Sequence, residues 1–279
     1  MSLKLGENFM KRSFLIILAS LFFLVNLNAL NIYAEENKAQ KSKDNQEVKE
    51  VKDNKDAKIN KPSSEQIINV LKEGNERFAS GKSKHSNIDN ARIAFASKED
   101  QAKHALATVL SCSDSKVPVE HIFDVGIMDV FVIRVAGNTC GLSEIGSIEY
   151  GISQANTPVL IVMGHTDCEV IKKALYTSPK NKAHFSENVK GIIDKIDPAV
   201  KKAVKSVPKD AKDNIIIGET VKQNVWQSIE AIFAKSPEIR KLFKTGKIKI
   251  VGAIYDVSTG KVNWLETAKI DEIAKKYKK

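Results

Sequence analysis

The N-terminal part of the sequence lacks three features, and their absence limits what this protein can be. No cysteine follows its apolar run, 14–25, so the sequence does not support a lipoprotein signal. The run is also shorter than the about 20 apolar residues of a transmembrane helix. No aromatic residue interrupts the lysine-rich stretch 38–61 and no nucleic-acid-binding motif accompanies it. We therefore exclude nucleic acid as a partner.

What the N-terminus does contain is the pattern of a secretory signal. Lys11 and Arg12 precede the apolar run, and small and polar residues follow it. We predict a signal peptide over 1–34, cleaved after Ala34 or Ala29, with Met10 as an alternative start. The protein would then be exported, periplasmic or extracellular, without a stable membrane span. An uncleaved membrane anchor is the alternative reading of the same run.

Two further segments follow this signal. Residues 35–62 consist mostly of lysine, acidic and amide residues, with almost nothing to bury, so we predict a disordered charged linker. Residues 63–279 remain for the fold, and the overall hydrophobic content of 42% allows one domain with a sizeable core. The net charge of +10 comes mainly from lysine, partly from the linker and the C-terminal 275–279.

The hydrophobic pattern of 63–279 predicts an α/β fold. Ser63 and Gln66 have the spacing of a capping box at the start of a helix. Continuous apolar runs predict strands over 105–110, 129–135, 158–163 and 248–255, followed by a short edge strand over 262–265. Helical spacing predicts helices over 90–103, 142–155, 168–176, 187–204 and 221–233. Helices alternating with strands at these lengths favour parallel crossovers.

Polar side chains follow two of the predicted strands. Cys112 and Asp114 come after the first strand, and because they are two apart in extended chain we expect their side chains to point the same way. His165 and Cys168 follow the third strand and would share one face of a first helical turn. Ligands bind at the carboxyl ends of strands in open α/β sheets. Two thiols, one imidazole and one carboxylate there form the ligand set of a zinc site.

Other interpretations of the cysteines stay open at this point. A free cysteine is often a small buried apolar residue, and Cys140, without a partner at ligand spacing, is best explained that way. Cys112 and Cys168 could instead form a disulfide in an oxidising compartment, but that leaves Asp114 and His165 without a role.

The motifs together resemble those of β-class carbonic anhydrases. The resemblance covers about residues 64–266, nearly all of the chain that we expect to fold. It rests on five segments in this order: 112–118 (CSDSKVP), 132–138 (VIRVAGN), 146–151 (GSIEYG), 164–168 (GHTDC) and 251–256 (VGAIYD).

This resemblance implies a fold, a cofactor and an activity. The fold would be a mainly parallel central sheet flanked by helices, with an N-terminal helical arm that packs across the partner subunit of a homodimer or tetramer. Cys112, His165 and Cys168 would hold one Zn²⁺ per chain, and a zinc-bound hydroxide would convert carbon dioxide reversibly to bicarbonate and a proton. Asp114 would accept a hydrogen bond from that hydroxide or occupy the fourth zinc position itself.

Three positions depart from the family pattern near the site. At one of them Lys103 stands in place of a glutamine that commonly binds substrate in the family, so we do not carry that role over. Lys116 stands where the family pairs the aspartate with an arginine, and a lysine offers a point charge rather than a two-pronged donor. We still assign catalytic roles to Asp114 and Lys116, but expect Asp114 to be held less firmly away from the metal. Glu169 replaces a glycine and brings a carboxylate beside the site. The alternative function is a catalytically impaired zinc-binding relative that binds bicarbonate or a protein partner.

Overall fold

The computed structural model describes residues 61–176 and 185–277. The predicted signal peptide and all but the last two residues of the predicted linker lie outside the described residues. Among the described residues, no helix combines the length and apolarity required to cross a membrane.

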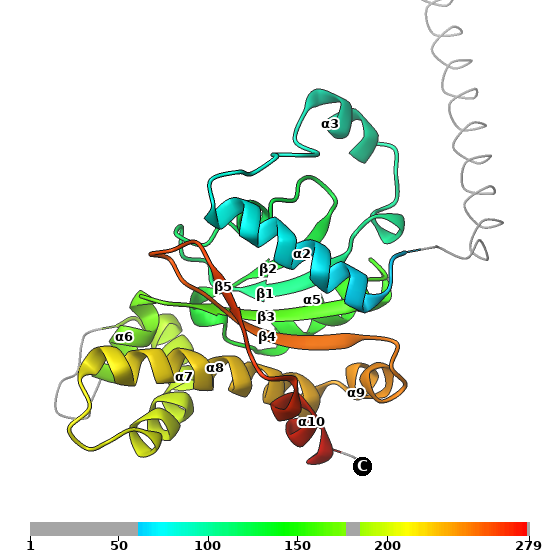
Figure 1. Ribbon diagram of the computed structural model, residues 1–279. Coiled ribbons are helices and arrows are strands. Elements are labelled where there is room, and N and C mark those ends of the chain that lie inside the picture. The colour runs from blue at the N-terminus through cyan, green and yellow to red at the C-terminus, as the bar shows by residue number, and fades with distance from the viewer. Residues whose placement is uncertain (1–60, 177–184, 278–279) are drawn as a thin grey trace, which may run out of the picture. The chain divides into compact units, whose positions relative to one another are not determined.

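One sheet organises the described part of the chain, with strand order β2-β1-β3-β4-β5 (Figure 1). The first four strands run parallel and β5 runs antiparallel to β4. This arrangement confirms the mainly parallel sheet predicted from the sequence. The strands are β1 (Ala107–Ser111), β2 (Val130–Arg134), β3 (Val159–His165), β4 (Lys249–Tyr255) and β5 (Val262–Trp264).

One face of the sheet is covered by helices α2 (Ser64–Ala79) and α4 (Val119–Ile122). The predicted capping box opens α2: the Gln66 N–H donates to Ser63 Oγ (3.3 Å), and the Ser63 N–H donates to Gln66 Oε1 (2.8 Å). From this helix Ile67 and Leu71 pack into a cluster with Val109, Ile161 and other residues that point to this face of the strands.

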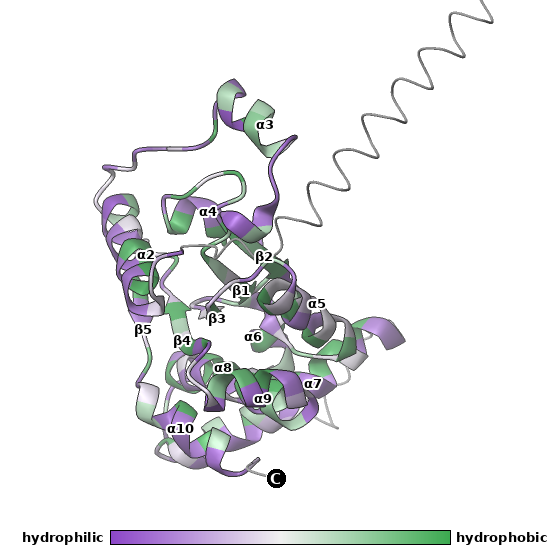
Figure 2. Cartoon of the chain, turned by 90° about the vertical axis from the view of Figure 1, so that its right-hand side faces the viewer, coloured by the Kyte–Doolittle hydropathy of each residue, from purple (hydrophilic) through white to green (hydrophobic). Residues whose placement is uncertain are grey.

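The opposite face is covered by α5 (Leu142–Ser153), α8 (Asp213–Lys235), α9 (Pro237–Lys244) and α10 (Thr267–Lys275). Figure 1 shows α2 on one side of the strands and α8 to α10 on the other. Leu110, Leu160 and Val162 alternate with the residues of the first face and pack here. Purple and green alternate along these helices in Figure 2, as expected of amphipathic helices with one buried side.

A third apolar cluster lies beyond the carboxyl ends of the strands. Helices α6 (Glu169–Tyr176), α7 (Glu187–Ser206) and α8 form it, and it also contains Cys112 and Cys168. The helices that carry this cluster therefore enclose the two cysteines that the sequence marked as candidate ligands.

Several predicted elements differ from the structure. The helix expected over 90–103 is two pieces, α3 (Asn90–Ala96) and a 3₁₀ turn η1 (Gln101–Lys103). The two are separate because the Asp100 side chain accepts the Ala102 N–H and starts a new turn. Helix α8 begins at Asp213, earlier than expected, and α4, α9 and α10 were not predicted. Strand β2 is a half-buried edge strand in this chain, although its continuous apolar run is typical of a strand covered on both faces.

Candidate metal site

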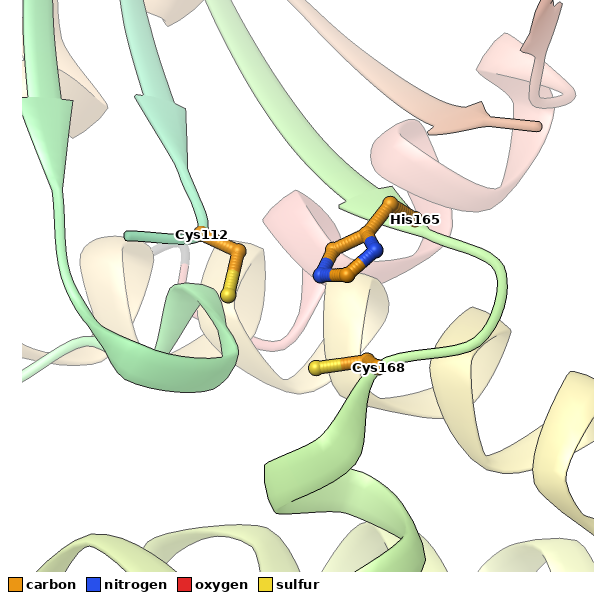
Figure 3. A group of neighbouring side chains, drawn as sticks. All are labelled: Cys112, His165 and Cys168. Atoms are coloured by element: carbon orange, nitrogen blue, oxygen red, sulfur yellow. The ribbon is translucent and has the colours of Figure 1, made fainter. Parts of the chain in front are cut away.

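The structure brings three of the predicted ligands together at the carboxyl end of the sheet. Cys112 directly follows β1, His165 is the last residue of β3, and Cys168 immediately precedes α6 (Figure 3). Because β1 and β3 are paired neighbours, their ends lie side by side. The ligand atoms of the three residues all lie within 4.8 Å of one another, and all three residues are buried.

The local structure around His165 and Cys168 differs from the expected helical turn. His165 belongs to β3, and Asp167 then adopts a left-handed backbone conformation with φ of +59°. This turn reverses the chain, so that Cys168 lies at the start of α6, where the Lys172 N–H donates to its carbonyl oxygen. The imidazole and the thiol therefore meet across a turn rather than along one helix face.

The imidazole of His165 presents a bare nitrogen to the two thiols. Its Nδ1 lies 2.8 Å from the carbonyl oxygen of Thr166, and since a carbonyl only accepts, Nδ1 carries the hydrogen. In the neutral ring Nε2 then has a free lone pair, and among the described residues it is buried without a hydrogen-bond partner. Histidine ligands of metals are oriented in this way, by a hydrogen bond from the other ring nitrogen.

The surroundings of Cys112 Sγ favour its thiolate form. The hydrogen bond from Cys168 lowers the pKa of Cys112 well below its usual value, although burial opposes the shift. The same hydrogen bond, together with burial, raises the pKa of Cys168. Backbone N–H groups of Gly137 (3.3 Å) and Asp114 (3.4 Å) also donate to Cys112 Sγ. Two sulfurs and a bare nitrogen around one point suit a divalent cation.

Gly137 is required at this position for two reasons. Its φ of +68° lies in the left-handed region, which glycine adopts at little cost. A Cβ atom there would also lie 2.9 Å from side-chain atoms of Val170 and Ile196. The N–H of Gly137 can therefore reach the Cys112 sulfur only because this residue has no side chain.

Asp114 lies beside the three ligands rather than among them. Its Oδ1 accepts the backbone N–H of Lys116 (2.9 Å), and its Oδ2 lies 4.0 Å from His165 Nε2. Asp114 is not part of the group whose ligand atoms all lie within 4.8 Å of one another. The carboxylate faces the site from its edge.

The ammonium of Lys116 is bound elsewhere. Its Nζ donates to Asp167 Oδ2 at 2.9 Å and to the Asp167 carbonyl oxygen at 3.0 Å, but it lies 3.7 Å from Asp114 Oδ2. The expectation that Asp114 is loosely held is consistent with this geometry. Sequence reasoning missed Asp167 as the main partner of Lys116, although its place between His165 and Cys168 puts it next to the site.

Asp167 is the centre of an ion-pair network at the edge of the site. Its Oδ1 accepts a hydrogen bond from Lys172, which also donates to Glu169 Oε1 (2.9 Å). The hydrogen bonds from Lys172 and Lys116 lower the pKa of Asp167 to about 2. Glu169, the carboxylate expected to perturb the metal, is exposed and paired with Lys172.

Arg134 fixes the loop that carries Cys112. From the end of β2, its Nε donates to the Cys112 carbonyl oxygen (3.1 Å) and its Nη2 to the Asp114 carbonyl oxygen (2.6 Å). Helix α8 holds the facing loop, because Asn224 donates to the Gly137 carbonyl oxygen (2.7 Å) and Ser228 to that of Asn138 (2.8 Å). These contacts position both loops that enclose the Cys112 sulfur.

Cys140 takes no part in the cluster. It is buried, and burial raises the pKa of its thiol to about 12. All three cysteines are free thiols in the structure.

Comparisons with known proteins agree with this geometry. A model of the family described as carbonic anhydrase matches residues 107–262, which include every candidate site residue. Carbonic anhydrase 2 of Mycobacterium tuberculosis is 30% identical over 195 residues, which are 69% of this chain and 88% of that relative.

Two solved structures share the fold. A β-carbonic anhydrase of Coccomyxa in complex with acetazolamide has a TM-score of 0.55 at 21% identity, and the match covers 69% of this chain and 83% of that one. One of two tetrameric β-carbonic anhydrases of Sordaria macrospora has a TM-score of 0.54 at 18% identity, over 62% of this chain and 85% of that one.

Proposed function

This chain belongs to the β-class carbonic anhydrase family, and from that premise we propose that it catalyses the reversible hydration of carbon dioxide to bicarbonate and a proton with one zinc ion per chain. The family resemblance is confirmed, and so is the mainly parallel sheet flanked by helices. Helix α2, the N-terminal arm expected to pack across a partner subunit, packs on the sheet of its own chain. The observation that carries the proposal is the cluster of two cysteine sulfurs and a buried, unpartnered His165 Nε2.

The donor set fits zinc. Cys112 and Cys168 would supply two thiolates and His165 one neutral nitrogen, and three protein ligands are typical of a catalytic zinc site. Soft sulfur with imidazole favours zinc over magnesium or calcium. Bound at this place, zinc supplies Lewis acidity, which makes water a nucleophile near neutral pH.

The chain itself orients the reacting water and receives its hydrogen bond. Asp114 Oδ1 is held by the Lys116 N–H, which leaves Oδ2 on the side of His165 Nε2 to accept a hydrogen bond from the attacking water. Arg134 fixes the positions of Asp114 and Cys112 relative to each other by donating to the backbone carbonyl oxygen of each. The burial of the three ligand residues excludes bulk water, which strengthens these polar interactions.

Stopped-flow carbon dioxide hydration, with zinc measured in parallel, tests the proposal on protein beginning at Ser63. We expect about one zinc per chain and hydration above the buffer rate. Cys112→Ala and Cys168→Ala should lose both, whereas Cys140→Ala should keep both because Cys140 lies outside the cluster. Stoichiometric zinc in the Cys112→Ala/Cys168→Ala double variant would refute the ligand assignment.

One observation favours a second candidate function, a zinc-binding relative with impaired hydration. The Lys116 ammonium binds Asp167 and leaves Asp114 Oδ2 without a close donor. If zinc is bound and hydration stays at the buffer rate, this candidate replaces the first. Lys116→Arg tests whether the missing donor to Asp114 causes the impaired hydration, since a guanidinium can hold a carboxylate through two donors. Hydration should then recover in this variant.

A homodimer or tetramer is part of the proposal. Within the described residues β2 pairs only with β1, so its other edge is open, and Leu142 at the start of α5 is 87% exposed. An open strand edge beside exposed apolar side chains is typical of a surface covered by another chain. Light scattering should give a mass of two or four chains, and Leu142→Lys should lower it.

Export is also proposed, on the sequence alone. The apolar run 14–25 after Lys11 and Arg12 is typical of a secretory signal. Mature protein from the periplasm or medium should begin at about Glu35 or Leu30 and then be cleaved readily within 35–62. N-terminal sequencing that finds 10–30 intact on exported protein would favour a membrane anchor instead.

A further inference from the structure

Lys116 lies between two carboxylates and binds only one of them closely. Asp167 offers it two acceptors, Oδ2 at 2.9 Å and the carbonyl oxygen at 3.0 Å. Asp114 offers only Oδ2 at 3.7 Å, which is beyond hydrogen-bond distance. The ammonium therefore binds Asp167, which precedes the candidate ligand Cys168, more closely than Asp114, whose carboxylate faces the site.

We infer that Asp167 is a positioning residue that holds Lys116 away from Asp114 and thereby sets how freely the Asp114 carboxylate can move onto the metal. This inference rests on the proposed function, because it assumes that a metal occupies the cluster of Cys112, His165 and Cys168. It assigns Asp167 a role that depends on Lys116 and not on any contact of its own with substrate.

The backbone conformation of Asp167 explains why Lys116 binds this residue more closely than Asp114. Its left-handed conformation, with φ of +59°, lets its carbonyl oxygen and its side chain both face the same ammonium. Lys172 binds the other carboxylate oxygen, Oδ1, and so leaves Oδ2 to Lys116. Asparagine adopts left-handed conformations more readily than most residues, so Asp167→Asn removes the charge with little strain.

Releasing Lys116 would change the surroundings of Asp114. One Asp114 oxygen is already held by the Lys116 N–H, so only Oδ2 is free to move. That atom is 4.0 Å from the bare nitrogen of His165, close enough to compete for a metal bound there. An ammonium on Oδ2 would keep it off the metal and leave a coordination position for water.

The test compares Asp167→Asn with the parent protein by two readouts on the zinc-loaded enzyme. One is kcat/KM for carbon dioxide hydration, and the other is the rate at which a chromogenic chelator removes zinc. Both should rise about two- to five-fold, because ion pairs between partly exposed groups are weak; Lys116 and Asp167 side chains are 37% and 49% exposed. Zinc release should quicken because Asp114 no longer contributes a ligand.

Two further variants separate positioning from a structural role. Lys116→Met removes the shared ammonium, so adding Asp167→Asn to it should change neither readout. Lys172→Met removes the other partner of Asp167 but leaves the Lys116 contact, so it should also change neither. An undiminished effect of Asp167→Asn in the Lys116→Met background, or the same effect from Lys172→Met, would overturn the inference.

A crystal structure of Asp167→Asn gives a readout that does not depend on activity. Lys116 Nζ should move to within hydrogen-bond distance of Asp114 Oδ2, and Lys116 remaining on residue 167 would contradict the inference. If the parent protein holds zinc without hydrating carbon dioxide, the proposed function fails, while the zinc-release rates still decide the role of Asp167. If it holds no zinc, both fail.

Discussion

Arg134 Nη2 lies 2.6 Å from the carbonyl oxygen of Asp114, and the same guanidinium reaches the carbonyl oxygen of Cys112 through Nε at 3.1 Å. A single side chain at the edge of the sheet thus holds both ends of the segment that carries a candidate ligand. Lysine cannot make both contacts in this fixed geometry.

Arg134→Lys should therefore loosen the Cys112 loop. We expect hydration to fall by about tenfold, as for a loss of about 1.4 kcal/mol, which is close to the lower end of what one hydrogen bond from a charged group contributes. Arg240→Lys is the matched control, since Arg240 also donates to two carbonyl oxygens, those of Phe233 and Ala234, away from the site. Equal losses of activity in the two variants would contradict the role of Arg134.

Removing the metal should lower the stability of the domain. Metal that binds only the folded state stabilises it by about 4 kcal/mol at free metal 1,000 times Kd. For a domain of this size that corresponds to about 8–16 °C in Tm. A chelator should produce this drop in differential scanning calorimetry of the parent and of Cys140→Ala, but not of His165→Ala, which should already melt at the lower temperature. A chelator effect that persists in His165→Ala would place the metal elsewhere.

Two glycines of α5 should respond in opposite ways to the same change. A Cβ on Gly151 would lie 2.3 Å from Thr108 Oγ1 and 2.8 Å from the ring of Phe131, because α5 packs closely on the sheet there. Gly151→Ala should destabilise the protein by about 1–3 kcal/mol through overpacking. Gly146 has nothing within 4 Å of such a Cβ, so Gly146→Ala should stabilise it by about 0.5–1 kcal/mol. Urea unfolding of both variants measures the difference, and equal effects would show that α5 can move away from β1.

Asp124 should make stability depend on pH. Burial alone would raise the pKa of its carboxyl group, but Arg77 Nε (2.6 Å) and the N–H groups of Lys84 and His85 donate to it and lower that pKa below its usual value. A pKa lowered in the folded state gives stability that is present above the unfolded value of about 4 and is lost as pH falls through the folded value.

Asp124→Asn should therefore cost about 2 kcal/mol at pH 7, in the range of hydrogen bonds to a charged group. Its deficit relative to the parent should shrink as the pH falls below about 4. Urea unfolding between pH 7 and 3 measures the free energy of unfolding of both proteins. Loss of any bound zinc in acid would affect both alike. The exposed Asp194, paired with Lys190, provides the control, since Asp194→Asn should leave the pH dependence unchanged. A stability deficit that stays constant with pH would mean that the charge of Asp124 is not what stabilises the folded protein.

The sequence was most informative where one apolar run specifies one buried strand. β1 and β3 lie within two residues of their predicted ends, and three of the four predicted ligands meet as expected. Both strands are buried on both faces, so most of their residues are apolar and the pattern was clear. The helices α4 and α9 were missed because they have only 4 and 8 residues, too few for a repeated apolar pattern.

Tertiary structure decided what local spacing could not. Three-residue spacing suggested a helical turn for His165 and Cys168, but the left-handed Asp167 places one on a strand and the other before a helix. The partner of Lys116 could not be read from its neighbours in sequence, since Asp167 is brought to it by the pairing of β1 with β3. Spacing identified the chemical groups of the site, whereas the sheet determined which of them touch.

The pairing of β1 with β3 also fixes the order of events during folding. Cys112 and His165 are about fifty residues apart in sequence, and parallel pairing over such a distance is slow because loop entropy is lost first. A zinc ion could not contact all three ligands until that pairing exists, so it would bind a sheet that is already formed. Interactions that form after the transition state slow unfolding without speeding folding. Zinc should thus lengthen the lifetime of the folded chain and leave its refolding rate unchanged.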